Sequence, residues 1–274
     1  MSHKMKRLAI GLFLAAFFSS GSLMFAANTA PAANSTPILV ELFTSEGCSS
    51  CPPADALLQQ LDAAQPMPGA QLIVLSEHVD YWDHLGWKDP FSSSLVTERQ
   101  AAYANHFGLA SSYTPEMVVD GTTEFVGNNS QLAKQALEKA YHVPKVPVRI
   151  SSISSDSTGK LQAYIEADVL AASAKVSAAD IYLVVALNRA ESQVEHGENG
   201  GRHLTYVAVV QSLTKVGAVD KNHAFAKQVE VKIDPHADPS NLRVIAFLQQ
   251  RGPGPVIGAT MSTLPGSAAQ RASR

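Results

Sequence analysis

The sequence predicts an α/β domain in the first half of the chain and an antiparallel, sandwich-like all-β domain in the second. Strand and helix patterns alternate up to about residue 143, whereas seven short strand patterns follow one another from residue 144 onward. Hydrophobic residues make up 46% and charged residues 16% of the 274 positions, which is enough apolar material for a buried core. This composition excludes intrinsic disorder, collagen and a coiled coil.

The first residues predict export from the cytoplasm. A basic start precedes an apolar run over residues 8–18, and small residues follow it. This pattern is typical of a cleaved secretory signal peptide, here residues 1–27, with a flexible leader over residues 28–36. An uncleaved membrane anchor is the alternative, because the run reaches about 20 residues if its serines are tolerated. We expect a periplasmic or secreted protein with no stable membrane span after cleavage.

The charge of the chain bears on its partners. Asp and Glu total 24 against 21 Lys and Arg, and the net charge is −3. Because binding to phosphate backbones relies on clustered Lys and Arg, no nucleic-acid partner is expected.

Hydrophobic periodicity predicts the elements of the first domain, residues 37–143. Prolines at positions 52 and 53 fit the first turn of a helix, Gly108 fits a helix C-terminus, and Asp120-Gly121 is a hairpin signal. The expected elements are a strand at 37–43, a helix from residue 52, a strand at 71–77, a helix at 95–107, strands at 117–119 and 124–127, and a helix at 131–141. Their order is βαβαββα.

The second domain, residues 144–265, is predicted to contain strands only, and residues 266–274 are expected to form a disordered tail. The expected strands are residues 146–153, 161–169, 181–187, 204–210, 229–233, 244–248 and 256–261. No catalytic constellation is visible among them, so we interpret this half as a scaffold or recognition module.

Cys48 and Cys51 are the only cysteines of the chain. A disulfide between them closes too short a loop to be a good staple, and a zinc site would need two further ligands. At the start of a helix, backbone N–H groups and the helix dipole favour a thiolate at Cys48, and Cys51 can then resolve a mixed disulfide. We therefore expect Cys48 to be the more exposed cysteine and to have a pKa below about 7.5.

The succession of strand, turn, Cys-x-x-Cys and helix resembles the active-site unit of the thioredoxin superfamily. Longer motifs are similar to a secreted thioredoxin-like family catalogued as domain of unknown function 1223. These motifs are ELFTSEGCSSCPPAD at 41–55, VDYWD at 79–83, GWKDPF at 86–91, YTP at 113–115 and ENGGR at 198–202. The resemblance implies a thioredoxin-like fold and a thiol–disulfide oxidoreductase without a cofactor, which acts through Cys48 and Cys51 on a protein or small-molecule thiol or disulfide.

The resemblance also implies a substrate groove over Cys48, formed by Ser49, Ser50, Trp82, Thr114 and Pro115, with a cis Thr114–Pro115 peptide bond. The Ser-Ser dipeptide stands where thioredoxin has Gly-Pro, so oxidation, reduction and isomerisation all stay open.

Thioredoxins carry a buried acid that assists proton transfer, and Glu41 is the nearest match here. It lies one residue further from the first cysteine than in thioredoxin. A solvent-facing carboxylate at the end of the strand is therefore the other interpretation of Glu41.

Two further polar runs have alternative interpretations. His78, Asp80, Asp83 and His84 follow a predicted strand, and they either bind a metal, line a groove beside Cys48, or belong to a solvated loop. The glycine-rich run at 195–203 lacks the context of a phosphate loop, so it is either a loop that reaches the first domain's site or an ordinary connection.

A non-catalytic binding module is the alternative to the enzyme. In that case the two cysteines hold a soft metal such as Cu(I) or form an inert disulfide.

Overall fold

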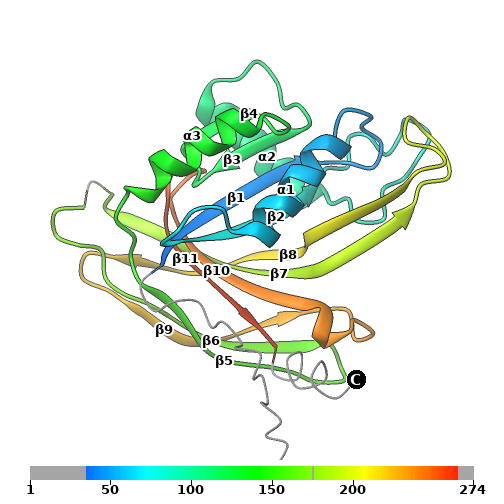
Figure 1. The fold of residues 1–274 in the computed structure, drawn as a ribbon. Helices are drawn as coiled ribbons and strands as arrows, with labels where there is room; N and C mark the ends of the chain where they lie inside the picture. Colours follow the sequence, from blue (N-terminus) through cyan, green and yellow to red (C-terminus); the bar gives the residue numbers. More distant parts are fainter. Residues whose placement is uncertain (1–34, 175, 265–274) are drawn as a thin grey trace, which may run out of the picture. The chain divides into compact units, whose positions relative to one another are not determined.

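The computed structural model describes residues 35–264 with the exception of residue 175 (Figure 1). The expected signal peptide at 1–27, the leader up to residue 34 and the tail from residue 265 lie outside the described residues. Across the described part of the chain, no helix combines the length and the apolar character needed to cross a membrane.

The helices and strands of the first half begin and end close to the expected positions. They are β1 (Thr36–Thr44), α1 (Pro52–Ala64), β2 (Ala70–His78), α2 (Ser94–Phe107), β3 (Glu116–Val119), β4 (Thr123–Val126) and α3 (Ser130–Tyr141). Local signals explain three of the helix ends. Two prolines occupy the start of α1, Gly108 adopts a left-handed conformation with φ of 71° after α2, and the Asn129 side chain accepts a hydrogen bond from the Leu132 N–H at the start of α3.

All seven strands expected in the second half are present. They are β5 (Val148–Ser155), β6 (Lys160–Ala167), β7 (Ala178–Gln193), β8 (His203–Asp220), β9 (Phe225–Lys232), β10 (Leu242–Gln250) and β11 (Val256–Thr263). The β7 and β8 strands, with 16 and 18 residues, are much longer than their apolar stretches suggested. They pair along almost their whole length, so that polar residues at the far end of the hairpin stay in the ladder.

Strands from both sides of residue 144 share one sheet. The described residues form an eight-stranded sheet in the order β11-β10-β7-β8-β2-β1-β3-β4 and a three-stranded sheet in the order β5-β6-β9. The two halves meet where β8 lies parallel to β2, with Val209 opposite Ser76. This junction fixes the position of the β7–β8 hairpin relative to the first half of the chain.

The large sheet buries both of its faces. Helices α1 and α3 cover one face of β1, where Val40 and Leu42 belong to their apolar cluster (Figure 1). On β7 the alternation of side chains separates two clusters, since Leu183 packs toward the three-stranded sheet and Val184 toward β1 and β2. The β7 and β10 strands therefore lie between two apolar layers.

Helix α2 is tied to the sheet by a buried ionic cluster. The Arg99 Nε donates to Glu41 Oε1 at 2.6 Å, and the Tyr103 hydroxyl donates to the other oxygen of Glu41 at 2.7 Å. Arg99 also donates to Gln249 of β10 at 3.1 Å. Glu77 Oε1 lies 3.7 Å from the Arg99 Nε, and burial together with the negative charge of Glu41 raises the pKa of Glu77 well above its ordinary value.

We predict that Glu77→Gln prevents the decrease in free energy of unfolding that the ionisation of Glu77 causes in the wild type as the pH rises. Because the pKa of Glu77 is raised in the folded state, its contribution is complete below the unfolded-state pKa of about 4.3 and is lost as the pH rises through the folded-state pKa. The variant lacks this titration, so its free energy of unfolding should rise relative to that of the wild type as the pH is raised from 5 to 8. Urea unfolding across this range measures the difference.

Glu138→Gln is the matched control, because Glu138 is exposed on α3 and pairs only with Lys134 at 3.9 Å. Its effect on stability should stay below about 0.5 kcal/mol at every pH. Parallel stability curves for Glu77→Gln and the wild type would contradict the assignment of Glu77 as a protonated group.

Candidate functional site

The cysteine turn lies between β1 and α1. Cys48 and Cys51 form a disulfide with an S–S distance of 2.08 Å and a Cα–Cα distance of 5.4 Å. Cys51 is the N-cap residue of α1, and both cysteines have 0% of their surface exposed, whereas Ser49 and Ser50 between them are exposed. The disulfide thus lies just below a surface formed by the two serines.

Residues of β2, of the segment after β2 and of β7 are joined to the cysteine turn through Glu46. Glu46 accepts hydrogen bonds from the Trp87 Nε1 at 2.6 Å and from the Ser192 hydroxyl at 3.2 Å. The Glu46 N–H donates to Asp89 Oδ2 at 2.9 Å, and the same carboxylate oxygen lies 2.7 Å from His78 Nδ1. Three segments that are distant in sequence therefore meet around a single glutamate.

The loop that joins β7 to β8, residues 194–202, covers the turn. The Asn199 Nδ2 donates to the carbonyl oxygens of Glu46 and Cys48 at 2.8 and 2.9 Å, and Asn199 itself is fully buried. Glu198 Oε2 accepts a hydrogen bond from the Ser49 N–H at 3.1 Å. In Figure 1 the far end of the hairpin lies beside the loops that follow β1 and β2. Of the two interpretations of the 195–203 run, the structure shows the loop that reaches the site.

This cover overturns one expectation about the cysteines. Cys48 is not the more exposed of the pair, because both are completely buried. The sequence pattern placed Cys48 at an open helix end, but the β7–β8 loop of the second half closes that end through Asn199.

Trp82 lies against Gly47 of the cysteine turn and is bonded to Thr114, which was also expected to line the groove. The Thr114–Pro115 peptide bond is cis, as predicted. The Trp82 Nε1 donates to the Thr114 hydroxyl oxygen at 2.8 Å. A Cβ atom added at Gly47 would lie 2.9 Å from the Trp82 Cβ, so only glycine fits there. Trp82 therefore spans the space between the cysteine turn and the segment that precedes β3.

Buried ionisable groups lie next to the cysteine turn. Asp55 in the first turn of α1 accepts a hydrogen bond from the Thr44 hydroxyl at 2.8 Å, and burial raises the pKa of Asp55 to about 7. Burial and the charge of Asp89 raise the pKa of Glu46. Burial alone would lower the pKa of His78, but the adjacent Asp89 carboxylate raises it. The site can therefore hold or release protons near neutral pH.

Glu41 is placed elsewhere in the fold. It is buried, which excludes the solvent-facing interpretation, and it binds Arg99 and Tyr103 of α2. Thr44, three residues later on β1, instead binds Asp55 of α1. Sequence reasoning missed Asp55, although an acid four residues after Cys51, on the helix face that carries buried Leu58, was a visible signal.

Three of the four residues considered as metal ligands are engaged in other contacts, and the fourth is exposed. His78 pairs with Asp89, the Thr97 hydroxyl donates to Asp80 at 2.6 Å, and the Ser92 hydroxyl donates to Asp83 at 2.8 Å, while His84 is exposed. Among the described residues, no group of three or more His, Cys, Asp or Glu side chains is arranged to hold a metal ion.

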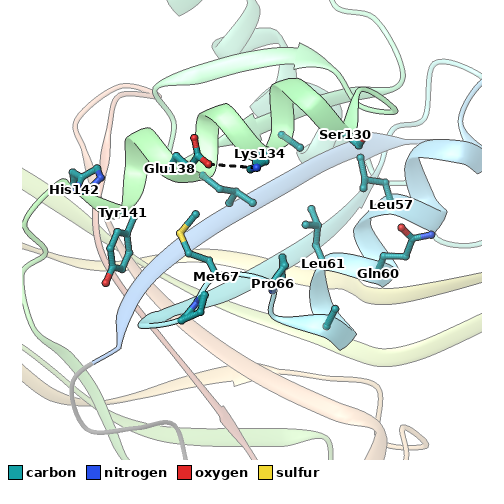
Figure 2. Close-up of a pocket in the computed structure, with 14 residues that line it drawn as sticks. Leu57, Gln60, Leu61, Pro66, Met67, Ser130, Lys134, Glu138, Tyr141 and His142 are labelled. Carbon is teal, nitrogen blue, oxygen red and sulfur yellow. Dashed lines mark ion pairs between the residues drawn. The ribbon is translucent and has the colours of Figure 1, made fainter.

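A separate groove of about 620 Å³ lies between α1 and α3 (Figure 2). Apolar side chains, among them Leu57, Leu61 and Met67, form its floor, and Lys134 and Glu138 stand at its rim. The cysteine turn contributes no residue to this groove, so the two features are independent.

We predict that Asn199→Ala uncovers the disulfide. The substitution leaves the carbonyl oxygens of Glu46 and Cys48 without their donor, which should cost about 2 kcal/mol in free energy of unfolding. The native disulfide should also be reduced faster by dithiothreitol, because the loop no longer holds the turn closed. Urea unfolding and mass spectrometry of alkylated thiols measure the two effects.

Asn222→Ala is the control, since Asn222 is exposed and it is the backbone N–H of Asn222 that donates to Asp220. Reduction of Asn199→Ala at the wild-type rate would show that Asn199 does not control access to Cys48.

Comparison with known proteins places the chain in a family without an assigned activity. No curated protein matches it. A crystal structure of an Agrobacterium tumefaciens protein is similar, with a TM-score of 0.62, 24% identity, and coverage of 85% of this chain and 96% of the other. HBP35 of Porphyromonas gingivalis has a TM-score of 0.63 at 15% identity, and the match covers 85% of this chain and 76% of that protein. At these identities the likeness concerns the fold alone. The profile described as "Protein of unknown function (DUF1223)" matches residues 39–249, and the chain therefore belongs to this family.

Proposed function

We propose that the protein is an exported thiol–disulfide oxidoreductase, with a thioredoxin-like first half and a sandwich-like second half. The observation that carries the proposal is a disulfide at the N-terminus of α1, between Cys48 and Cys51, with an ionisable Asp55 one helical turn further on. Export from the cytoplasm agrees with this pair, because disulfides persist in oxidising compartments.

The chemistry starts from the disulfide form. A thiolate of a dithiol partner attacks the Cys48 sulfur, the Cys48–Cys51 bond breaks, and the Cys51 sulfur leaves as a thiolate that takes up a proton. The second thiol of the partner loses its proton and attacks the mixed disulfide, which releases Cys48 and the oxidised partner. Two electrons have then passed from the partner to the cysteine pair, and the reverse sequence reduces a partner disulfide.

Asp55 is the proton donor that this sequence requires at Cys51. The Asp55 N–H donates to the Cys51 carbonyl oxygen at 3.1 Å, and residues four apart on a helix lie on the same face. Its pKa of about 7 leaves a substantial fraction both protonated and ionised near neutral pH. A general acid with a pKa near the working pH gives the most effective proton transfer. Asp55 thus takes the role that the resemblance had suggested for Glu41.

The groove residues define where a partner lies. Ser49 and Ser50 are exposed above the sulfurs, and the pair of Trp82 and Thr114 forms one side of the approach. Since both cysteines are buried, a protein or small-molecule thiol reaches Cys48 when the β7–β8 loop moves away from Ser49.

We predict that Asp55→Asn slows exchange and removes its pH dependence near 7. Amide replacement keeps the shape of the side chain but cannot deliver a proton, so the rate of disulfide reduction by a peptide dithiol should fall about 100-fold. Thr44→Val is the companion variant: it removes the hydrogen bond that lowers the pKa of Asp55, so the midpoint of the pH profile should move upward. Stopped-flow kinetics from pH 5 to pH 9 report both, and a profile with an unchanged midpoint in both variants would contradict the role of Asp55.

Turnover itself tests the proposed function. With oxidised glutathione as the electron acceptor, the wild type should oxidise a reduced peptide over repeated turnovers, or with dithiothreitol as the electron donor it should reduce insulin over repeated turnovers. Cys48→Ser and Cys51→Ser should each abolish this activity. Cys51→Ser should also accumulate a mixed disulfide through Cys48, visible as an added mass.

The inert disulfide is the second candidate, and the complete burial of both sulfurs favours it. Absence of turnover with an intact wild-type disulfide would establish this alternative. Binding of one Cu(I) by the reduced protein, lost in Cys48→Ser, would establish the metal-binding module.

A further inference from the structure

The start of α1 offers few hydrogen-bond donors to a thiolate at Cys48. The two residues after Cys51 are prolines without an N–H, and the next two N–H groups of the helix donate to the Cys51 carbonyl oxygen at 2.8 and 3.1 Å. The Ser50 hydroxyl oxygen lies 3.4 Å from the Cys48 sulfur and is the donor of this contact, since a disulfide sulfur carries no hydrogen. The other donors in the turn that could face Cys48 are the N–H groups of Ser49 and Ser50 and the Ser49 hydroxyl.

Glu198 accepts hydrogen bonds from Ser49. Its carboxylate accepts the Ser49 N–H at 3.1 Å, and bonds from the Ser49 side chain and N–H lower the pKa of Glu198, so it is ionised at neutral pH. The other titratable groups packed around the turn are Glu46, Asp55, Asp89 and His78. Within the described part of the chain, no Lys or Arg is bonded to residues 44–51. The charge that faces the helix end is thus mostly negative.

We propose that Glu198, supplied by the second half of the chain, biases the cysteine pair toward the disulfide by opposing a thiolate at Cys48. The proposal rests on the proposed function, because it concerns the same cysteine pair. When the dithiol forms, Glu198 either keeps the Ser49 N–H and repels the thiolate, or gives up the N–H and loses its own hydrogen bond. Each of these two outcomes raises the free energy of the dithiol form and leaves that of the disulfide form unchanged. A helix N-terminus without Glu198 would lower the pKa of the Cys48 thiol, and the negative charge of Glu198 raises it.

The relevant equilibrium is written with glutathione as the two-electron donor. Two molecules of reduced glutathione convert the Cys48–Cys51 disulfide into two thiols, and the glutathione sulfurs end in one oxidised glutathione molecule. Stabilising the Cys48 thiolate shifts this equilibrium toward the dithiol and makes the pair more oxidising. Because Glu198 opposes the thiolate, it shifts this equilibrium toward the disulfide and makes the cysteine pair more reducing.

Glu198→Gln isolates the charge, because its amide oxygen still accepts the Ser49 N–H. We expect the equilibrium constant for reduction by glutathione to rise between about 3-fold and 10-fold, which corresponds to about 15 to 30 mV. Iodoacetamide labelling of the reduced protein across pH should give a lower pKa for Cys48 in the variant. Both differences should shrink at 1 M salt, where the screening length falls to about 3 Å.

Glu195→Gln is the matched control. It removes one negative charge from an exposed side chain of the same loop without touching the Ser49 N–H, and it should leave the equilibrium constant within about 1.5-fold of the wild type. An unchanged constant in Glu198→Gln, or an equal change in Glu195→Gln, would overturn the proposal. A disulfide that no dithiothreitol buffer reduces in either protein would overturn it as well.

The two proposals fail differently. If the wild type shows no turnover with peptide or insulin while Glu198→Gln still shifts the glutathione equilibrium, the oxidoreductase function is wrong and the role of Glu198 stands. If turnover is present and the equilibrium does not move, only the role of Glu198 is wrong.

Discussion

The parallel pairing of β8 with β2 positions the second half of the chain against the cysteine turn. A single opposed pair, Ser76 and Val209, marks this junction within the eight-stranded sheet. Because β7 and β8 are long and run together, their connecting loop is carried to the far end of β1, where the turn begins. Together with the hydrogen bonds from Ser192 to Glu46 and from Gln59 to Thr205, this junction holds Asn199 and Glu198 beside the cysteine turn.

The enclosure of the disulfide has consequences for its chemistry. Burial keeps water and large reagents from the sulfurs and strengthens every charge interaction in their surroundings. Here that environment is mostly acidic, with Glu46 and Asp89 held by hydrogen bonds from Trp87, Ser192 and His78. In our proposal this environment disfavours a thiolate at Cys48. The second half of the chain supplies part of it through Ser192, Glu198 and Asn199.

Buried acids serve two separate purposes on the two faces of β1. On one face, Glu41 neutralises Arg99 and helps to fasten α2 to the sheet. On the other, Asp55 accepts a hydrogen bond from Thr44. Burial, together with the negative charges of Asp89 and Glu46, outweighs the lowering by His78 and Thr44 and brings the pKa of Asp55 to about 7. A paired carboxylate stabilises structure, whereas an unpaired buried one exchanges protons near neutral pH.

The sequence by itself determined the local elements and the location of the chemistry. Period-two and helical patterns, with prolines and a glycine at helix ends, identified the strands, the helices and the Cys-x-x-Cys turn, because these depend on neighbours along the chain. The family resemblance supplied the cis Thr114–Pro115 bond. Only the tertiary structure decided that the halves share a sheet, that Glu41 binds Arg99, and that Asn199 buries Cys48. Those contacts join residues 58 to 151 positions apart, and their partners are chosen by packing and charge compensation, which no local pattern records.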